Sequence, residues 1–175
     1  MDQFRLAIIE DLADIRESLE AFFMRQEEVK ETLAVGSMEA FFDKVRTGFV
    51  PDVVLTDIGL PGMNGIDGIE EIKFHFPDAD IIMLTIFNDN DRIFRSLCSG
   101  AVGYALKGTP FPEIKKAILE IRAGGSYMSP TIARKVVEHF TPVKVRKTEK
   151  LSPKEKIIIK RLTEGLSYKQ IAELE

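Results

Sequence analysis

The chain has 175 residues, 45% of them hydrophobic, which is enough for one ordinary core and a smaller appendage. Its single cysteine excludes an internal disulfide, and no amino-terminal apolar stretch resembles a signal peptide or a membrane span. We therefore expect a cytoplasmic protein that does not associate with membranes.

The net charge of −4 is unevenly distributed along the chain. Residues 1–142 contain 15 basic and 23 acidic side chains, whereas residues 143–175 contain 9 basic and 5 acidic ones. An acidic body with a basic tail is compatible with a signalling domain joined to a nucleic-acid-binding one, and also with a basic linker that is merely solvated.

The first 125 residues alternate between short apolar runs, expected to be strands, and amphipathic helical patterns. The first helical pattern begins at about Leu12, and later helices are expected to end before Pro77 and at Gly100. Asn88 or Asn90 is expected to cap the fourth helix. Five strand–helix units predict an α/β domain with a parallel sheet. The apolar runs cover residues 4–9, 53–56, 81–84 and 102–106, and a short amphipathic strand is expected over residues 29–35.

Beyond residue 125 the strand pattern stops and only helical signals remain. Ser129 and Pro130 are expected to start a short amphipathic helix that ends at Thr141. Residues 143–150 form a polar, basic stretch. We assign three regions: a first domain over residues 1–125, a helical and basic linker over 126–150, and a second segment over 151–175.

Ionisable or hydroxyl side chains end the four apolar runs. Glu10 and Asp11 follow the first run, Asp57 the second, Thr85 the third and Lys107 the fourth. Because the carboxyl ends of adjacent parallel strands meet at one edge of a sheet, we expect three carboxylates, one hydroxyl and one ammonium in a single cleft. Carboxylates so close together repel each other, and a divalent cation would relieve that repulsion.

This order of residues resembles the receiver domain of two-component response regulators, over about residues 3 to 123. The resemblance implies a flavodoxin-like (βα)5 fold with a parallel five-stranded sheet in the order 2-1-3-4-5. It implies that Asp57 is the phosphoacceptor, that a cognate histidine kinase supplies the phosphoryl group, and that the protein catalyses only its own phosphorylation and dephosphorylation. The other implied site residues are the metal-binding pair Glu10 and Asp11, the switch pair Thr85 and Tyr104, and the phosphate-binding Lys107.

Magnesium is the cofactor that the resemblance implies. Mg²⁺ prefers oxygen ligands in an octahedron and keeps several waters, so Asp11, Asp57 and the backbone carbonyl of Gly59 form a suitable set, with Glu10 binding through water. The expected reaction is in-line phosphoryl transfer to Asp57, with the metal and the lysine neutralising charge on the phosphoryl oxygens. Movement of the switch pair then changes the shape of the surface.

Two segments near the carboxyl end, residues 151–155 and 164–172, resemble the opening of a NarL/LuxR-type helix-turn-helix domain. The first contains a capping box formed by Ser152 and Glu155, and the second contains another that starts at Ser167. Such a domain normally continues into a recognition helix, which we do not expect here, so the DNA-binding residues stay unknown. The resemblance implies transcription regulation by a phosphorylation-dependent homodimer, with specific DNA binding by a longer product only.

Other classes of function were compared with this hypothesis. A phosphohydrolase with an Asp nucleophile would need a second Asp two residues after Asp57, where the chain has Gly59. A flavin-binding module is disfavoured because Glu10 and Asp11 follow the first strand, in place of a Ser, Thr or Gly cradle for a phosphate. A stand-alone receiver that acts through protein–protein contacts is the stronger alternative.

Three further residues carry local predictions. Ile86 follows Thr85 where many receivers have Ala or Gly, which predicts narrower access to the site. Gly108 follows Lys107 where many receivers have proline. Both departures leave the phosphorylation residues intact and bear on the lifetime of the phosphorylated state. Cys98 is expected to be a packed thiol on the apolar face of its helix.

Overall fold

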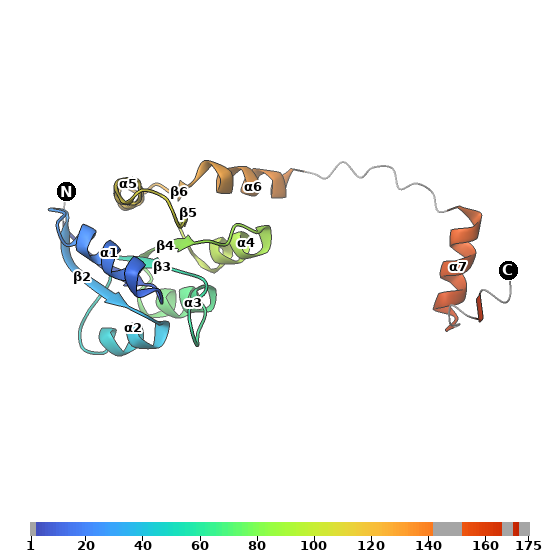
Figure 1. The fold of residues 1–175 in the computed structure, drawn as a ribbon, viewed down its shortest axis with the longest axis horizontal. Coiled ribbons are helices and arrows are strands. Elements are labelled where there is room, and N and C mark those ends of the chain that lie inside the picture. Colours follow the sequence, from blue (N-terminus) through green and yellow to red (C-terminus); the bar gives the residue numbers. More distant parts are fainter. Residues whose placement is uncertain (1–2, 142–151, 166–169, 172–175) are drawn as a thin grey trace. The chain divides into compact units, whose positions relative to one another are not determined.

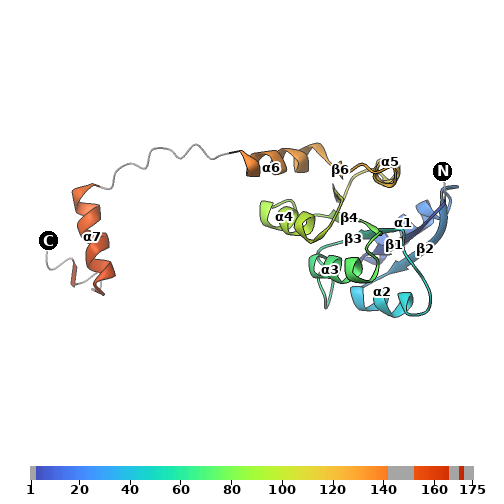
Figure 2. The same ribbon diagram turned by 180° about the vertical axis from the view of Figure 1, so that it is seen from behind.

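The structure is a computed structural model that describes residues 3–141, 152–165 and 170–171 (Figure 1). The chain divides into two compact units, Met1–Phe140 and Thr141–Glu175, and the sheet belongs entirely to the first. The opposite view shows the same alternation of strands and helices in that unit (Figure 2).

Six parallel strands form the sheet in the order β2-β1-β3-β4-β5-β6. The interior strand β3 reads Val-Val-Leu-Thr and is buried at every position, as a parallel strand covered on both faces requires. The flavodoxin-like α/β fold and the 2-1-3-4-5 order of the five main strands are confirmed. The strands are β1 (Phe4–Ile9), β2 (Val29–Val35), β3 (Val53–Thr56), β4 (Asp80–Thr85), β5 (Gly103–Leu106) and β6 (Tyr127–Met128).

The sequence analysis predicts five strands, and the sheet contains a short sixth one. β6 comprises only Tyr127–Met128 and pairs in parallel with Gly103 and Tyr104 of β5. Two residues are too few to show an alternating or continuous apolar pattern, so periodicity could not reveal this strand. Its cause is tertiary, because without β6 the polar backbone groups of β5 would form an unpaired edge.

Helices follow each of the five main strands, and short caps fix where several of them begin. Ser37, Asn64 and Asp89 cap α2, α3 and α4, each accepting hydrogen bonds from backbone N–H groups of the first turn. Asp89 therefore replaces the predicted Asn88 or Asn90 as the cap of α4. The helices of the first unit are α1 (Ala13–Phe23), α2 (Met38–Val45), α3 (Gly65–His75), α4 (Asn90–Ser99), α5 (Phe111–Arg122) and α6 (Pro130–Phe140).

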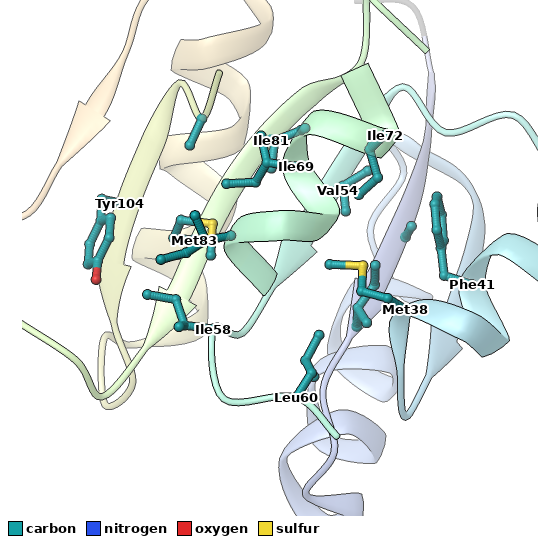
Figure 3. Packing of buried hydrophobic residues seen from close by; sticks show 14 of the residues in the cluster. Met38, Phe41, Val54, Ile58, Leu60, Ile69, Ile72, Ile81, Met83 and Tyr104 are labelled. Carbon is teal, nitrogen blue, oxygen red and sulfur yellow. The ribbon is translucent and has the colours of Figure 1, made fainter. Parts of the chain in front are cut away.

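Successive strand residues point to opposite faces of the sheet, so each face has its own hydrophobic core. One core lies under α2, α3, α4 and the start of α6, and Figure 3 shows residues of α2 and α3 packed near Val54, Ile81 and Met83. The other core lies under α1 and α5, where Phe23 and Ile118 are fully buried. The sheet is thus covered on both faces, and these helices leave the ends of its strands uncovered.

Cys98 is exposed, contrary to the predicted packing. The buried face of α4 is formed by Ile93 and Ser96, with Leu97 partly buried beside them. Cys98 lies about 100° further around the helix than Leu97, which turns it to solvent. Ser96 can occupy the core because its hydroxyl donates to the carbonyl of Arg92 at 2.8 Å.

The packing of the first unit continues past residue 125 into α6. The predicted short helix after Ser129 is present, and its Ile132 is fully buried in the core of the α2–α4 face. The backbone N–H of Ser129 donates to the carbonyl of Tyr104 on β5 at 3.2 Å. The division into a domain of residues 1–125 and a linker of residues 126–150 stays a prediction.

In the second unit the described helix is α7 (Pro153–Thr163). The predicted capping box is confirmed, since Ser152 accepts from the Glu155 N–H and the Glu155 carboxylate accepts from the Ser152 N–H at 2.7 Å. Gly165, with a φ of 87°, follows the helix in the left-handed conformation that glycine favours. The predicted basic stretch of residues 143–150 and the second capping box at Ser167 lie outside the described residues. Among the described helices, none has the length and hydropathy of a membrane span.

Candidate functional site

Four strands deliver the candidate side chains to the carboxyl edge of the sheet. Glu10 follows β1, Asp57 follows β3, Thr85 ends β4 and Lys107 follows β5. The four strands are neighbours in the order β1-β3-β4-β5, so their ends converge as the sequence predicts. The loop after Asp57 turns back tightly, and a Cβ at Gly65 would lie 1.9 Å from the carbonyl oxygen of Asp57. Only glycine permits that approach, which fixes the start of α3 against the site.

Lys107 joins the two buried carboxylates. Its Nζ lies 2.8 Å from Asp57 Oδ2 and 2.7 Å from Glu10 Oε2. The side chains of Lys107, Glu10 and Asp57 are only 10%, 3% and 6% exposed. Backbone donors complete the contacts, with the Ile58 N–H 2.7 Å from Asp57 Oδ1 and the Leu12 N–H 3.1 Å from Glu10 Oε1, an oxygen that also accepts from Lys107 Nζ at 2.8 Å. Buried charges are tolerated here because they are paired and hydrogen-bonded.

Burial and hydrogen bonding shift the pKa values of Glu10 and Lys107. Burial raises the pKa of Glu10, and this outweighs the opposing hydrogen bonds from Lys107 and from the backbone of Leu12. For Lys107, burial alone would lower the pKa, but the hydrogen bonds to Asp57 and Glu10 raise it overall. Lys107 therefore stays an ammonium ion at neutral pH.

The acidic side chains form a possible cation site. Glu10, Asp11 and Asp57 each offer a carboxylate oxygen, and these atoms lie within 4.8 Å of one another. Asp11 is exposed while the other two are buried, so the cluster opens to solvent on the Asp11 side. Three oxygen donors and no sulfur or nitrogen ligand suit a hard cation such as Mg²⁺. Gly59 lies beside the cluster, where a Cβ would be 3.6 Å from Asp57 Oδ2.

The predicted switch residues lie on the neighbouring strands β4 and β5, and both form hydrogen bonds with the backbone of Phe87. Thr85 and Tyr104 are both fully buried. The Thr85 hydroxyl accepts a hydrogen bond from the N–H of Phe87 at 3.4 Å, and the Tyr104 hydroxyl donates to the carbonyl of Phe87 at 2.8 Å. Burial raises the pKa of Tyr104, which keeps its hydroxyl a donor.

Sequence reasoning missed the residues that cover the site from the start of α4. A Cβ at Gly59 would lie 3.4 Å from the Phe87 ring, so Phe87 packs beside the candidate phosphoacceptor loop. The Arg92 guanidinium lies 4.1 Å from the centroid of that ring and pairs with Asp89 at 2.8 Å. The spacing of an aromatic residue and an arginine after the β4 hydroxyl was the available signal. Ile86 is 69% exposed, and its predicted effect on access to the site stays a prediction.

Arg16 is a second residue that sequence reasoning missed. Its Nη1 donates to the backbone carbonyls of Glu10 at 2.7 Å and Asp11 at 3.1 Å. The guanidinium thus fixes the turn that carries the acidic pair without occupying the carboxylates themselves. An arginine one turn into the helix after an acidic pair could have suggested this contact.

Two hollows open beside the site. One, of about 580 Å³, lies between α1 and the β5–α5 loop and is lined by Ile15, Leu84, Lys107 and Phe111 among others. The other, of about 550 Å³, lies between the β3–α3 loop and α4 and includes Gly59, Phe87 and Arg92. The first hollow adjoins the site at Lys107 and the second at Gly59, and neither is lined by the acidic cluster itself.

A parallel, doubly wound sheet with an acidic cluster, a hydroxyl and a lysine at its carboxyl edge defines a receiver-like signalling domain. The response regulator receiver domain family matches residues 6–119, and the chain belongs to this family. The predicted response regulator of the NarL/LuxR type is confirmed.

Similar proteins extend the likeness beyond the receiver part. The chain is 29% identical over 179 residues to the transcriptional regulatory protein LnrK of Bacillus subtilis (strain 168), covering 97% of this chain and 81% of LnrK. A solved LuxR-family response regulator from Aurantimonas sp. SI85-9A1 is 27% identical with a TM-score of 0.69, covering 79% of this chain and 98% of that one. The structure of an RcsB–DNA complex has a TM-score of 0.71 at 23% identity, covering 98% of this chain and 82% of that one, and supports the fold alone.

Proposed function

We propose that Asp57 accepts a phosphoryl group from a phosphohistidine on a cognate histidine kinase. The observation that carries this proposal is the contact of Lys107 with Asp57 at 2.8 Å, with Glu10 and Asp11 beside it at an open sheet edge. A carboxylate with a fixed ammonium partner and neighbouring cation ligands is suited to phosphoryl transfer. Membership of the receiver family supports this role.

In the proposed reaction an oxygen of the Asp57 carboxylate attacks phosphorus while the bond from phosphorus to the histidine nitrogen breaks. The electron pair of that bond returns to the imidazole ring, and an acyl phosphate forms on Asp57. Lys107 neutralises charge on the transferred group. Water later attacks phosphorus, which releases inorganic phosphate and restores the carboxylate. These two steps are the only chemistry that we propose for the chain.

Mg²⁺ is the proposed cofactor. Asp11, Asp57 and the backbone carbonyl of Gly59 would hold it directly, and Glu10 through water. When bound, the ion supplies positive charge to the phosphoryl oxygens. The residues present fit this group, because the three carboxylates exceed the single ammonium of Lys107 and all offer hard oxygen ligands.

Thr85 and Tyr104 would convert phosphorylation into a change of surface. The Thr85 hydroxyl lies in the strand next to Asp57 and can donate to a phosphoryl oxygen. A hydroxyl can donate while it accepts, but a movement of the Thr85 hydroxyl toward Asp57 would lengthen its present contact with the Phe87 N–H, and Phe87 in turn accepts from Tyr104. The added charge of about −1.5 to −2 biases an equilibrium between two arrangements of this segment.

We further propose that the output is transcription regulation by a phosphorylation-dependent homodimer in the cytoplasm. The support is the likeness to transcriptional regulators such as LnrK and to a LuxR-family response regulator over most of the chain. Residues 1–125 would form the receiver, 126–150 the linker, and 151–175 part of a helix-turn-helix domain for DNA. A receiver that acts only through protein–protein contacts is the alternative.

Phosphorylation of the intact chain tests the central proposal. Incubation with Mg²⁺ and acetyl phosphate should add one phosphoryl group, measured by mass spectrometry of the intact protein, and Asp57→Asn should abolish the addition. Asp52→Asn is the matched control, since Asp52 pairs with Arg5 at the opposite edge of the sheet. Undiminished labelling of Asp57→Asn would sink the assignment.

A further inference from the structure

Helix α6 makes contacts at both of its ends, with Tyr104 of β5 at its start and with Phe94 of α4 at its end. At the start of α6, the N–H of Ser129 donates to the Tyr104 carbonyl at 3.2 Å. One turn later, Ile132 is fully buried in the core that also contains the Tyr104 ring. At the end of α6, the His139 ring stacks on Phe94 of α4, with centroids 3.6 Å apart and planes at 26°. Figures 1 and 2 both show α6 running alongside α4.

The start of α4 is tied to the candidate site. Phe87 precedes α4 and touches both switch residues, through its N–H to Thr85 and its carbonyl to Tyr104. Arg92, in the first turn of α4, lies over the Phe87 ring. Phe94 is two residues further along the same helix, so a displacement of Phe87 that carries Arg92 with it also displaces Phe94.

We propose that α6 is a clasp on α4 and that phosphorylation of Asp57 loosens it; this inference rests on the phosphoacceptor role proposed above. A phosphoryl oxygen on Asp57 draws the Thr85 hydroxyl into a donating hydrogen bond. Because a hydroxyl can donate and accept at once, it is the movement of Thr85 toward the phosphoryl group that breaks the hydrogen bond from the Phe87 N–H, which at 3.4 Å is already long and weak. The freed segment shifts α4, and the stack of Phe94 on His139 is lost.

The clasp is weak enough to act as a switch. Phe140 makes an edge-on contact with Phe94 at a centroid distance of 5.7 Å, yet Phe140 is 74% exposed. Among the described residues, Phe94 belongs to neither buried core, whereas Ile132 anchors the other end of α6. Val136, in the middle of α6, also packs against that core, so it is the last turn of α6 that can leave α4 while the rest stays packed. An aromatic contact of this kind changes such an equilibrium about 2- to 10-fold.

Hydrogen exchange of the intact chain with Mg²⁺ and beryllofluoride, a mimic of the phosphoryl group, tests the clasp. We expect slower exchange at residues 57–65 and about 2- to 10-fold faster exchange at residues 135–140 in the parent, and neither change in Asp57→Asn. Phe94→Ala should show the faster exchange at residues 135–140 without beryllofluoride. Phe74→Ala is the matched control, because Phe74 is 80% exposed on α3.

The outcomes separate this inference from the function on which it rests. A response at residues 57–65 without one at residues 135–140 would overturn the clasp and leave the phosphoacceptor intact. No response at either segment would overturn both. Parent-like exchange in Phe94→Ala would also overturn the clasp, because the stack would then not hold α6. Since coupling is reciprocal, Phe94→Ala should also bind beryllofluoride more tightly by the factor seen in exchange, and unchanged affinity would contradict the coupling.

Discussion

At the amino edge of the sheet, acidic and basic side chains are matched one to one. Arg5 pairs with Asp52 at 3.3 Å, and Arg122 lies 3.8 Å from Asp80. All four side chains are between 23% and 33% exposed. Water can reach these pairs, so each contributes little to stability. At Asp80, burial raises the pKa against the attraction of Arg122 and Lys73.

At the carboxyl edge of the same sheet, three carboxylates share one ammonium. Glu10, Asp57 and Lys107 are at most 10% exposed, and Asp11 adds a third negative charge. This edge therefore carries buried negative charge in excess, which is unfavourable by itself. Acidic and basic residues occur at both edges, so residue type alone does not distinguish the carboxyl edge. The imbalance of charge and the burial do distinguish it, because a buried excess of negative charge favours the binding of a cation.

The largest expected effect is the loss of the single ammonium from the carboxyl edge. Lys107→Met should lower the free energy of unfolding by about 3 kcal/mol in metal-free buffer, because two buried carboxylates lose their shared partner. Urea denaturation at neutral pH measures this.

The matched substitution at the amino edge is Arg122→Met. Its expected cost is about 1 kcal/mol or less, because Arg122 and Asp80 are a third and a quarter exposed and only loosely paired. Equal losses in the two variants would contradict the proposed difference between the edges.

A smaller effect is expected from Mg²⁺ itself. A cation that binds only the folded chain stabilises it by about 1.4 kcal/mol when its free concentration is ten times the dissociation constant. The midpoint temperature of thermal unfolding should therefore rise when Mg²⁺ is added to the parent protein. Asp11→Asn should remove most of it, and because Asp11 is exposed, the substitution leaves the core undisturbed.

Asp52→Asn serves as the control for magnesium, since it removes a carboxylate from the balanced edge. The unfolding midpoint of Asp52→Asn should rise with Mg²⁺ by as much as that of the parent protein. If Asp52→Asn and Asp11→Asn respond alike, the ion is not held by the acidic cluster at the carboxyl edge.

The position of the site could be predicted because each of its residues directly follows or ends an apolar strand. Once parallel strands are ordered, the sheet register alone brings Glu10, Asp57, Thr85 and Lys107 together. The sequence could not tell the two members of the acidic pair apart in the same way. Glu10 turns inward to Lys107 while Asp11 faces solvent, and that depends on how the turn after β1 is held by Arg16.

The missed features depend on contacts between segments and not on any local pattern. β6 exists because β5 offers it an edge, and Phe87 lies beside the candidate site because the β4–α4 segment approaches Gly59 of the β3–α3 loop. The error on Cys98 has the same origin. Helical periodicity placed it near the apolar face, but Ser96 took the buried position by bonding to its own helix.

The smallest expected effect is a pH dependence at Glu10, because its burial and its contact with Lys107 act in opposite directions. The pKa of Glu10 is raised above 4.5, so the folded chain holds this proton more strongly than the unfolded chain does. The resulting stabilisation is complete below pH 4.5 and is lost as the pH rises through the folded pKa. Glu10→Gln removes the group while keeping an oxygen for Lys107 and for the Leu12 N–H.

Between pH 4 and pH 7, in metal-free buffer, the unfolding free energy of the parent should therefore fall relative to that of Glu10→Gln. Glu39 supplies a control of opposite sign, because its hydrogen bond from the backbone of Met63 lowers its pKa below 4.5. Its stabilisation is present above pH 4.5 and is lost as the pH falls, so the parent should gain stability relative to Glu39→Gln as the pH rises. Urea titrations across this range give both differences. A Glu10 difference that follows the Glu39 direction would mean that Lys107, and not burial, governs the charge of Glu10.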